Sequence, residues 1–188
     1  MSPPAIGLGL LALVALERCV ELLVSTRNAR RALARGGVEL GRGHYPAMVL
    51  FHALFLLACA VEPWLLPRAW PRALTLTCAA LVLAAQALRW WAVATLGPRW
   101  STRIVVLPGA PPVVGGPYRW LRHPNYLAVV IELLALPLAL GAPWTAVLGS
   151  IAYAVLLAGR IPAEERALGA PWAEAFQGRA RLVPGRPR

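Results

Sequence analysis

Two short segments carry most of the polar chemistry of this chain. The first, GPYRWLRHPNYL at 116–127, places arginine, histidine and tyrosine side chains directly before an apolar run. A helix that begins at Pro124 would have free N–H groups and a partial positive charge at its start. His123 and Tyr126 are three residues apart and would share a face there. This segment therefore suits an anionic or zwitterionic ligand.

The second segment, RIPAEERAL at 160–168, ends a later apolar run. Arg160 and Glu164 are four residues apart, so a helix would present both on one face. A carboxylate suits an amine or ribose hydroxyls, and a guanidinium suits an anionic group. Arginine, histidine and tyrosine are also ordinary anchors at a membrane interface. The combination of the two segments favours a cofactor site over simple anchoring.

A loop rich in proline and glycine precedes the first segment. RWSTRIVVLPGAPPVVGG contains three prolines, which exclude a helix over most of its length. IVVLP is typical of an extended strand. Val113 and Val114, before two glycines, would expose backbone N–H and C=O groups that could pair with the edge of a purine base.

Composition indicates a membrane protein. The chain has 188 residues, of which 59% are hydrophobic and 14% charged. Its apolar runs approach the ~20 residues that span a bilayer. We predict an all-α integral membrane protein with about five transmembrane helices, a C-terminal helical hairpin, and a cytoplasmic cofactor-binding loop and tail. The predicted spans are Ala5–Val24, Ala47–Leu66, Ala73–Leu96, Asn125–Leu140 and Trp144–Ile161. They form one domain over 1–188, with three spans in 1–97 and the cofactor-binding half in 98–188.

The net charge of +11 would suggest nucleic-acid binding in a soluble protein. Here the arginines alternate with the spans: fifteen fall on one side of the membrane and two, Arg68 and Arg72, on the other. The positive-inside rule then places the N-terminus outside and the C-terminus in the cytoplasm, in a membrane that we expect to be the bacterial inner membrane. The first loop, the 116–127 segment and the tail should meet on the cytoplasmic side. We predict no nucleic-acid partner.

Several ionisable or amide side chains fall inside the predicted spans, where each needs a partner or a cavity. These residues are Glu17, Arg18, Glu21, His52, Gln86, Arg89 and Glu132. One interpretation is a buried ion-pair network, for example Glu17 or Glu21 with Arg89. The other is a polar cavity, lined by Glu17, Glu21, His52 and Glu132, for the head group of a lipid-like substrate. The three cysteines have no metal-ligand spacing, and no metal site is predicted.

The pattern GPYxxxRHPxY, followed by a helical hairpin and RIxxEExxL, resembles the isoprenylcysteine carboxyl methyltransferase family. The resemblance covers roughly Ser101 to Pro184. The N-terminal half, with LERCVELLVSTRNARR, is similar to the bacterial branch of that family. Part of that branch is associated with O-methylation of alkylated resorcinols or pyrones.

The resemblance implies an S-adenosylmethionine site built without a Rossmann domain. The implied cofactor-binding residues are Ala110, Pro111, Pro112, Val113, Tyr118, His123, Pro124, Asn125, Tyr126 and Glu164, with Arg103 as a further contact. Arg160 would face the substrate. Ala128 replaces a frequent glycine, and Trp172 and Phe176 replace frequent tyrosines. These departures leave the cofactor site intact but weaken the case for a prenylcysteine substrate.

The acceptor decides whether a base is needed. A carboxylate with a pKa near ~4 is already ionised, whereas a phenol with a pKa near ~10 must lose a proton. Glu132 is the first candidate base, because it lies two turns along the helix that would carry the cofactor; Glu21 and His52 are the others. The expected partners are a lipophilic acceptor from the bilayer and membrane lipids, with no obligatory protein partner.

Three alternatives stay open on the sequence alone. A phospholipid N-methyltransferase would use the same cofactor and differ only in its acceptor. A reductase similar to the sterol reductases would use NADPH, whose extra phosphates call for more basic residues around the loop. A non-enzymatic membrane scaffold would keep the fold and bind no cofactor.

Overall fold

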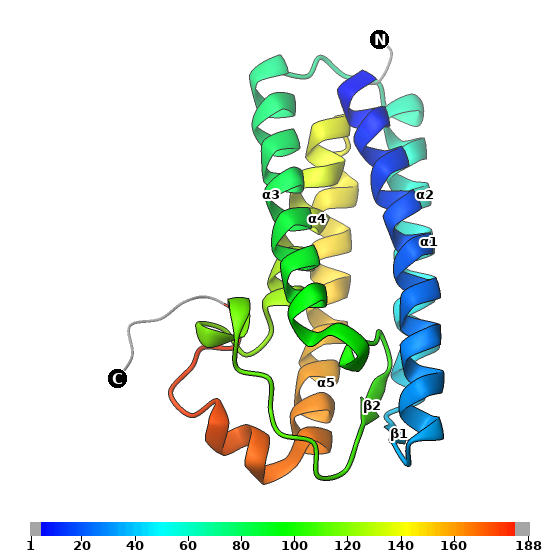
Figure 1. Cartoon of the computed structure of the whole chain (residues 1–188). Coiled ribbons are helices and arrows are strands. Elements are labelled where there is room, and N and C mark those ends of the chain that lie inside the picture. The colour runs from blue at the N-terminus through cyan, green and yellow to red at the C-terminus, as the bar shows by residue number, and fades with distance from the viewer. Residues whose placement is uncertain (1–4, 183–188) are drawn as a thin grey trace.

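Five long helices form a single bundle in the computed structural model, which describes residues 5–182 (Figure 1). The helices are α1 (Ala5–Ala34), α2 (His44–Leu65), α3 (Arg72–Leu96), α4 (Pro124–Leu140) and α5 (Pro143–Ala175). They correspond one to one with the predicted spans. The prediction of an all-α membrane protein is confirmed.

The predicted bounds are wrong at two helix ends. Helix α1 continues from Val24 to Ala34, and α5 continues from Ile161 to Ala175. Both extensions are rich in alanine, arginine or glutamate, which favour helix in water as well as in lipid. A prediction based on hydropathy ends where the apolar run ends, whereas these two helices continue into polar sequence.

Three segments are long and apolar enough to cross a membrane: Tyr45–Leu65, Arg72–Arg99 and Pro143–Ala175. Helix α4 is apolar but shorter, with 17 residues. Helix α1 has 30 residues, but it carries Glu17, Arg18 and Glu21 near its middle. Charged groups at this depth need partners inside the bundle, and the arrangement of the helices supplies them.

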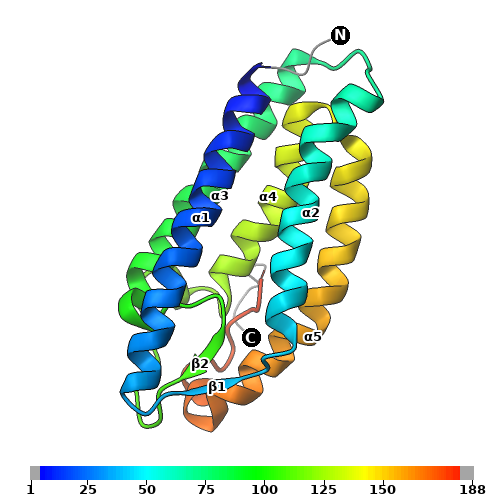
Figure 2. The same ribbon diagram turned by 90° about the vertical axis from the view of Figure 1, so that its right-hand side faces the viewer.

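Helix α4 lies between two pairs of helices, with α1 and α3 on one side and α2 and α5 on the other (Figure 2). Its closest neighbour is α3. Small buried residues, including Ala85 and Ala92 on α3 and Ala128 and Ala135 on α4, allow close approach of helix backbones in a membrane. Ala128, in place of the glycine frequent in the family, is fully buried.

The turn between α4 and α5 confirms the predicted hairpin. Gly141 ends α4 with a φ of 80°, a left-handed conformation that glycine adopts without strain. Glu62 of α2 then accepts hydrogen bonds at the start of α5. Its Oε2 lies 2.7 Å from the Thr145 amide nitrogen, and its Oε1 lies 3.2 Å from that of Trp144. A carboxylate at a helix N-terminus is favourable.

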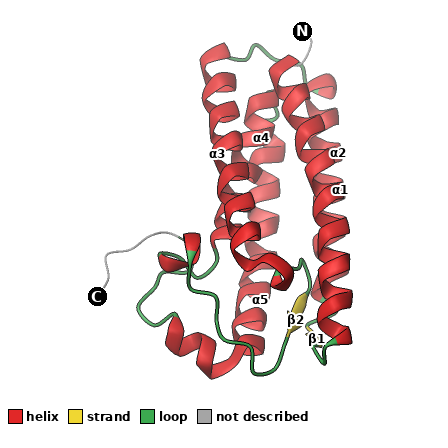
Figure 3. Ribbon diagram, in the orientation of Figure 1, coloured by secondary structure: helices red, strands yellow, loops and turns green. Residues whose placement is uncertain are grey.

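The other end of the bundle gathers three segments that are distant in sequence (Figures 1 and 3). Strand β1 (Val38–Leu40), after α1, pairs antiparallel with β2 (Ile104–Val106). Leu121, in the segment before α4, forms a bridge with Ala180 of the tail. The first loop, the 116–127 segment and the tail therefore meet at one end of the bundle, as predicted, and IVV is extended as predicted.

Candidate functional site

A cavity of about 790 Å³ opens at this arginine-rich end and extends between the helices. Thirteen predicted site residues line it: Glu21, His52, Arg103, Ala110, Pro111, Pro112, Val113, Tyr118, His123, Asn125, Tyr126, Arg160 and Glu164. Pro124, Glu17 and Glu132 are not among its lining residues. Most of the residues implied by the family resemblance thus surround one space.

Tyr126, Arg160 and Glu164 form the centre of the site. Tyr126, two residues into α4, donates its hydroxyl hydrogen to Glu164 Oε2. Arg160 Nε lies 3.1 Å from the same hydroxyl and 3.8 Å from Glu164 Oε2. This contact joins the two polar segments of the sequence across the α4–α5 hairpin.

One guanidinium nitrogen of Arg160 has no hydrogen-bond partner among the described residues. Its Nη2 donates to the Thr102 carbonyl at 2.8 Å, which fixes the guanidinium against the loop. Its Nη1 is buried and has no partner among residues 5–182. A buried donor without a partner is costly, and this arginine lines the cavity. The arrangement suits a ligand oxygen at Nη1.

His123 is held between two aromatic rings. Its ring centroid lies 5.4 Å from that of Tyr126 and 5.6 Å from that of Trp172. Its Nε2 lies 3.1 Å from Glu165 Oε1, and Arg181 Nη2 lies 2.6 Å from the other oxygen of that carboxylate. Hydrogen bonding to the carboxylate raises the pKa of Arg181, so Arg181 stays charged. The tail thereby fixes the orientation of His123 through Glu165.

Glu165 was missed by the sequence reasoning. The available signal was the pair of adjacent acidic residues at 164 and 165. Consecutive side chains on a helix point to different faces, so the second carboxylate of such a pair contacts different partners from the first. Glu164 faces Tyr126 and Arg160, whereas Glu165 faces His123 and the tail.

Trp172 and Phe176, the two aromatic residues that replace frequent tyrosines of the family, are buried. A break at Gly169, with a φ of 75°, turns the end of α5 inward. The two rings stack with centroids 4.7 Å apart, and both pack in a buried cluster with Tyr118 and Ala92. Burial raises the pKa of the Tyr118 hydroxyl, which therefore remains a hydrogen-bond donor. The break at Gly169 explains why these aromatics cover the site.

The loop before α4 forms one wall. Arg99 Nη1 donates to the Pro111 carbonyl, which holds the 110–113 stretch in place. The guanidinium of Arg103 is directed to other partners, 3.5 Å from Glu39 and 4.7 Å from the centre of the Tyr45 ring. Asn125 Oδ1 is buried and has no partner in the part of the chain that the structure describes. It offers an acceptor to a ligand in the cavity.

A second polar cluster lies deeper in the bundle. Arg18 of α1 contacts Glu21 at 2.6 Å and Glu132 at 2.9 Å. Arg89 of α3 contacts Glu21 at 3.3 Å and Glu132 at 3.2 Å, and Gln86 donates to Glu132 at 2.8 Å. This confirms the predicted buried ion-pair network, in which Glu21 is a partner of Arg89.

Two substrate-site predictions need correction. Glu17 lies outside the cavity lining, and its Oε1 accepts a hydrogen bond from Trp90 Nε1 at 3.0 Å. Glu132 Oε2 already accepts three hydrogen bonds, two of them from guanidinium groups. A carboxylate so occupied, and outside the cavity, is poorly placed to take a proton from a substrate. The geometry argues against Glu132 as a base, because the arginines of α1 and α3 reach it first.

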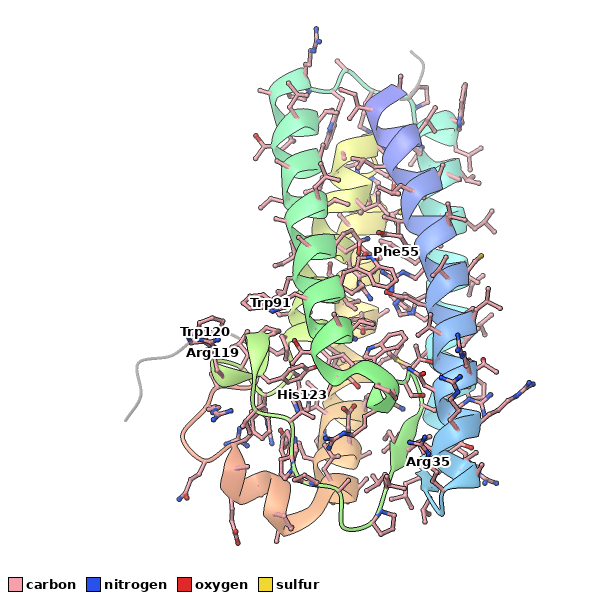
Figure 4. The ribbon with its side chains drawn as sticks, viewed as in Figure 1. Arg35, Phe55, Trp91, Arg119, Trp120 and His123 are labelled. Atoms are coloured by element: carbon pink, nitrogen blue, oxygen red, sulfur yellow. The ribbon has the colours of Figure 1, made fainter. Side chains whose placement is uncertain are left out.

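Figure 4 shows how residues from different elements surround this end of the bundle. His123 lies inside, between the lower part of α3 and α5, whereas Trp91 and Trp120 lie together on an outer side. The latter two rings meet edge to face with centroids 5.7 Å apart. The 116–127 segment therefore has two roles: Trp120 anchors it outside, and His123 faces the site.

The fold and the cavity define a helical membrane protein with a ligand site at one end of the bundle. The family model for the isoprenylcysteine carboxyl methyltransferase (ICMT) family matches residues 77–170, half of the chain. The chain belongs to this family, whose members are membrane methyltransferases that generally depend on S-adenosylmethionine. The match favours a methyltransferase over a reductase.

Two bacterial relatives share most of the chain. An uncharacterised protein of Bacillus subtilis (strain 168), YpbQ, is 40% identical over 159 residues, which cover 85% of this chain and 94% of the relative. An uncharacterised protein of Haemophilus influenzae is 28% identical over 152 residues, covering 80% of this chain and 88% of the relative. Both similarities extend well beyond the region matched by the family model, so the N-terminal half is shared as well.

Proposed function

We propose that this protein transfers a methyl group from S-adenosylmethionine to an oxygen atom of a lipophilic acceptor. The observation that carries the proposal is the single cavity that joins Tyr126, Arg160 and Glu164 to a chamber within the bundle. A polar cofactor from the cytoplasm and an apolar acceptor from the bilayer could meet in such a space. Transfer then depends mainly on holding donor and acceptor in line.

The residues at the outer end of the cavity fit the cofactor. S-adenosylmethionine supplies an electrophilic methyl group bound to a positively charged sulfur. The Glu164 carboxylate suits the amine or the ribose hydroxyls, and the unpaired Asn125 Oδ1 suits another N–H or O–H donor. The rings of Trp172 and His123 offer apolar faces, and the 110–113 backbone offers polar groups for the adenine.

The inner part of the cavity suits an apolar acceptor. Helix α1 contributes Ala15, Cys19 and Leu22 to its wall, and α2 contributes Met48, Val49, Ala53 and Leu56. Burial of a hydrocarbon chain against such side chains is worth about 0.8 kcal/mol per CH₂ group. This wall supports a lipid-like acceptor more than a small polar one.

The charges in the cavity favour an oxygen acceptor over an amine. Arg18, Arg89 and Arg160 all line it, and Arg160 Nη1 has no partner among the described residues. Guanidinium groups attract an anionic oxygen and repel the ammonium of a phospholipid head group. Phospholipid N-methylation is therefore the less favoured alternative.

We place the arginine-rich end of the bundle in the cytoplasm and the N-terminus outside. The support is the positive-inside rule applied to loops that the fold brings to one end. This orientation gives the cavity access to a cytoplasmic cofactor. Cysteine labelling at the α2–α3 loop, from outside the cell, would test it.

Cofactor binding is the first test of the proposal. Purified protein in detergent should bind S-adenosylhomocysteine saturably in a calorimeter. Glu164→Gln should weaken that binding by a factor on the order of 10 to 10², since a hydrogen bond to a charged group contributes ~1.5–3 kcal/mol. Glu174→Gln is the matched control, because Glu174 is exposed and outside the cavity lining. Absence of saturable binding would overturn the proposal and support a scaffold.

The acceptor atom can be identified by transfer of a labelled methyl group. Membranes of a producing strain, supplied with methyl-labelled S-adenosylmethionine, should yield labelled lipids that Arg160→Gln abolishes. Mild alkali releases the label from a methyl ester, whereas a methyl ether keeps it. Label in an amine-bearing lipid would contradict an oxygen acceptor.

A further inference from the structure

Two buried polar side chains of α1 lie next to the site without lining it. Ser25 is 1% exposed and Asn28 is 7% exposed, and neither belongs to the cavity wall. They are three residues apart, so they share a face of the helix. That face contacts the loop between α3 and β2, beside which the C-terminal part of α1 runs (Figure 1). Buried polar groups are normally hydrogen-bonded, and the partners of these two show what they hold in place.

Asn28 binds both ends of a short turn. Its Nδ2 donates to the Gly97 carbonyl at 3.2 Å and to the Trp100 carbonyl at 2.9 Å. Carbonyl oxygens only accept, so the amide nitrogen must face them. A single 3₁₀ turn, Gly97–Arg99, lies between the two carbonyls. The turn cannot tilt without breaking at least one of these bonds.

Arg99, in this turn, connects Asn28 to the cofactor side of the cavity. Its Nη1 donates to the Pro111 carbonyl. Pro111 belongs to the 110–113 stretch, whose backbone we assign to the adenine, and that stretch lines the cavity. A shift of the turn would move the guanidinium and release this wall.

Ser25 uses all of its hydrogen-bonding capacity on the same loop. Its Oγ accepts from the Thr102 amide nitrogen at 2.9 Å, and it lies 2.7 Å from Thr102 Oγ1 and 3.2 Å from Ser101 Oγ. A hydroxyl has one hydrogen to donate and two lone pairs, so three contacts satisfy it. Helix α1 therefore holds Thr102 by both its amide and its side chain.

Thr102 passes this constraint to Arg160. The Thr102 carbonyl accepts a hydrogen bond from Arg160 Nη2 at 2.8 Å, and the Tyr126 hydroxyl lies 3.1 Å from Nε. A guanidinium is planar and rigid, so two held nitrogens fix the position of the third, Nη1. Without Ser25, the Thr102 carbonyl would be free to move, and one of these two fixed points would be lost.

We propose that Ser25 and Asn28 are positioning residues for two different halves of the site. Asn28 sets the cofactor wall through Arg99. Ser25 sets Arg160, on the acceptor side, through Thr102. This inference rests on the proposed methyl transfer. Because the two residues act on different groups, their loss should change different constants of the enzyme: cofactor affinity for Asn28, and the rate of transfer for Ser25.

Cofactor affinity tests the role of Asn28 without any turnover. Calorimetry in detergent should show a several-fold weaker affinity for S-adenosylhomocysteine in Asn28→Ala than in the wild type. Arg99→Ala should weaken it as well, and the double variant should bind no more weakly than Arg99→Ala alone, because Asn28 acts through Arg99. Additive losses would overturn this step. Thr26→Ala is the matched control, since Thr26 is partly exposed and outside the cavity wall.

Transfer of labelled methyl groups in membranes tests the role of Ser25. Ser25→Ala should lower the rate at saturating S-adenosylmethionine by a factor on the order of 10 to 10², since a small misplacement of a reacting or orienting group is costly. The KM for S-adenosylmethionine should stay unchanged. Thr102→Val removes the same hydroxyl contact from the loop side and should lower the same rate, so it answers the question if Ser25→Ala does not fold.

The contrast between the two α1 variants is the decisive result. Changes in the same constant for Ser25→Ala and Asn28→Ala would overturn the inference. So would lower unfolding temperatures of both variants with unchanged affinity and rate, because α1 would then only brace the loop. Wild-type protein that neither binds S-adenosylhomocysteine nor transfers a methyl group would instead contradict the proposed function.

Discussion

The outer and inner ends of the cavity are built in different ways. At the outer end, two short segments on either side of one hairpin supply Tyr126, Arg160 and Glu164. Beside the inner end, outside the cavity lining, Glu132 of α4 is held by Arg18 of α1 and by Arg89 of α3, 114 and 43 residues away in sequence. The groups of the outer end belong to two short sequence motifs. The groups of the inner end come together only when α1, α3 and α4 pack against one another.

The difference also concerns energy. Buried atoms without partners among the described residues occur in both regions: Arg160 Nη1 and Asn125 Oδ1 at the outer end, and Arg18 Nε, Arg89 Nε and Gln86 Oε1 in the ion-pair network. At the inner end, four charged groups hold one another across the helices. We expect substitutions at the inner network to affect stability most, and substitutions at the outer end to affect binding and turnover most.

The largest effect should follow loss of Glu132. Glu132→Leu leaves Arg18 and Arg89 buried with one carboxylate fewer, and removal of one member of a buried ion pair costs about 3–5 kcal/mol. Unfolding in detergent would measure this cost. Glu174→Leu, at an exposed position, should change stability by less than about 0.5 kcal/mol.

A double variant sharpens this result. Glu132→Leu with Arg89→Leu removes one charge of each sign, so its cost should be smaller than the sum of the two single costs. Additive costs would show that the two groups do not interact energetically and would contradict a stabilising network.

The next effect concerns turnover at the outer end. Arg160→Gln removes a guanidinium that lines the cavity and whose Nη1 has no partner among the described residues, and loss of one such donor typically lowers kcat by a factor on the order of 10². Initial rates with labelled cofactor would measure it. Arg166→Gln, one residue past Glu165 on the exposed side, serves as the control. Equal effects of the two would show that total charge matters and not the position of Arg160.

A smaller effect is expected in the loop that leads into the site. Gly116 has a φ of 53°, and a Cβ there would lie 2.3 Å from Thr95 Oγ1. Gly116→Ala should cost about 1–2 kcal/mol from its left-handed backbone alone. Gly115→Ala is the matched control, because its φ is −85° and its Cβ would meet open space. Similar unfolding temperatures for the two variants would contradict the loop conformation.

The smallest effect should come from the tail. Arg181→Ala removes an exposed ion pair with Glu165, which is worth less than about 1 kcal/mol of stability. Because Glu165 orients His123, we expect a few-fold loss of S-adenosylhomocysteine affinity, larger at low salt. Titrations at two ionic strengths would measure it. Unchanged affinity would show that the ion pair of the tail does not contribute to cofactor binding.

Much of the outer site could be predicted because its signals are local. Proline at 124 marks the start of α4, and the spacing of Arg160 and Glu164 places both on one face of α5. The partners of the charged residues inside the bundle were predicted less well from the sequence. The sequence grouped Glu17 and Glu21 in one polar cavity, but Trp90 donates a hydrogen bond to Glu17, whereas Arg18 and Arg89 contact Glu21.

By itself, the sequence determined the helices, the hairpin, the gathering of arginine-rich loops and the family motifs, because hydropathy, proline and short spacings act within a few turns. Only the tertiary structure decided which buried carboxylate accepts hydrogen bonds from arginines and which histidine nitrogen has no protein partner among the described residues. The sequence favoured Glu132 over Glu21 and His52 as the candidate base. Helix packing placed two guanidinium groups on Glu132, and α2 left His52 Nε2 without a protein partner in the described chain. Such partners come from distant parts of the chain, which no local pattern records.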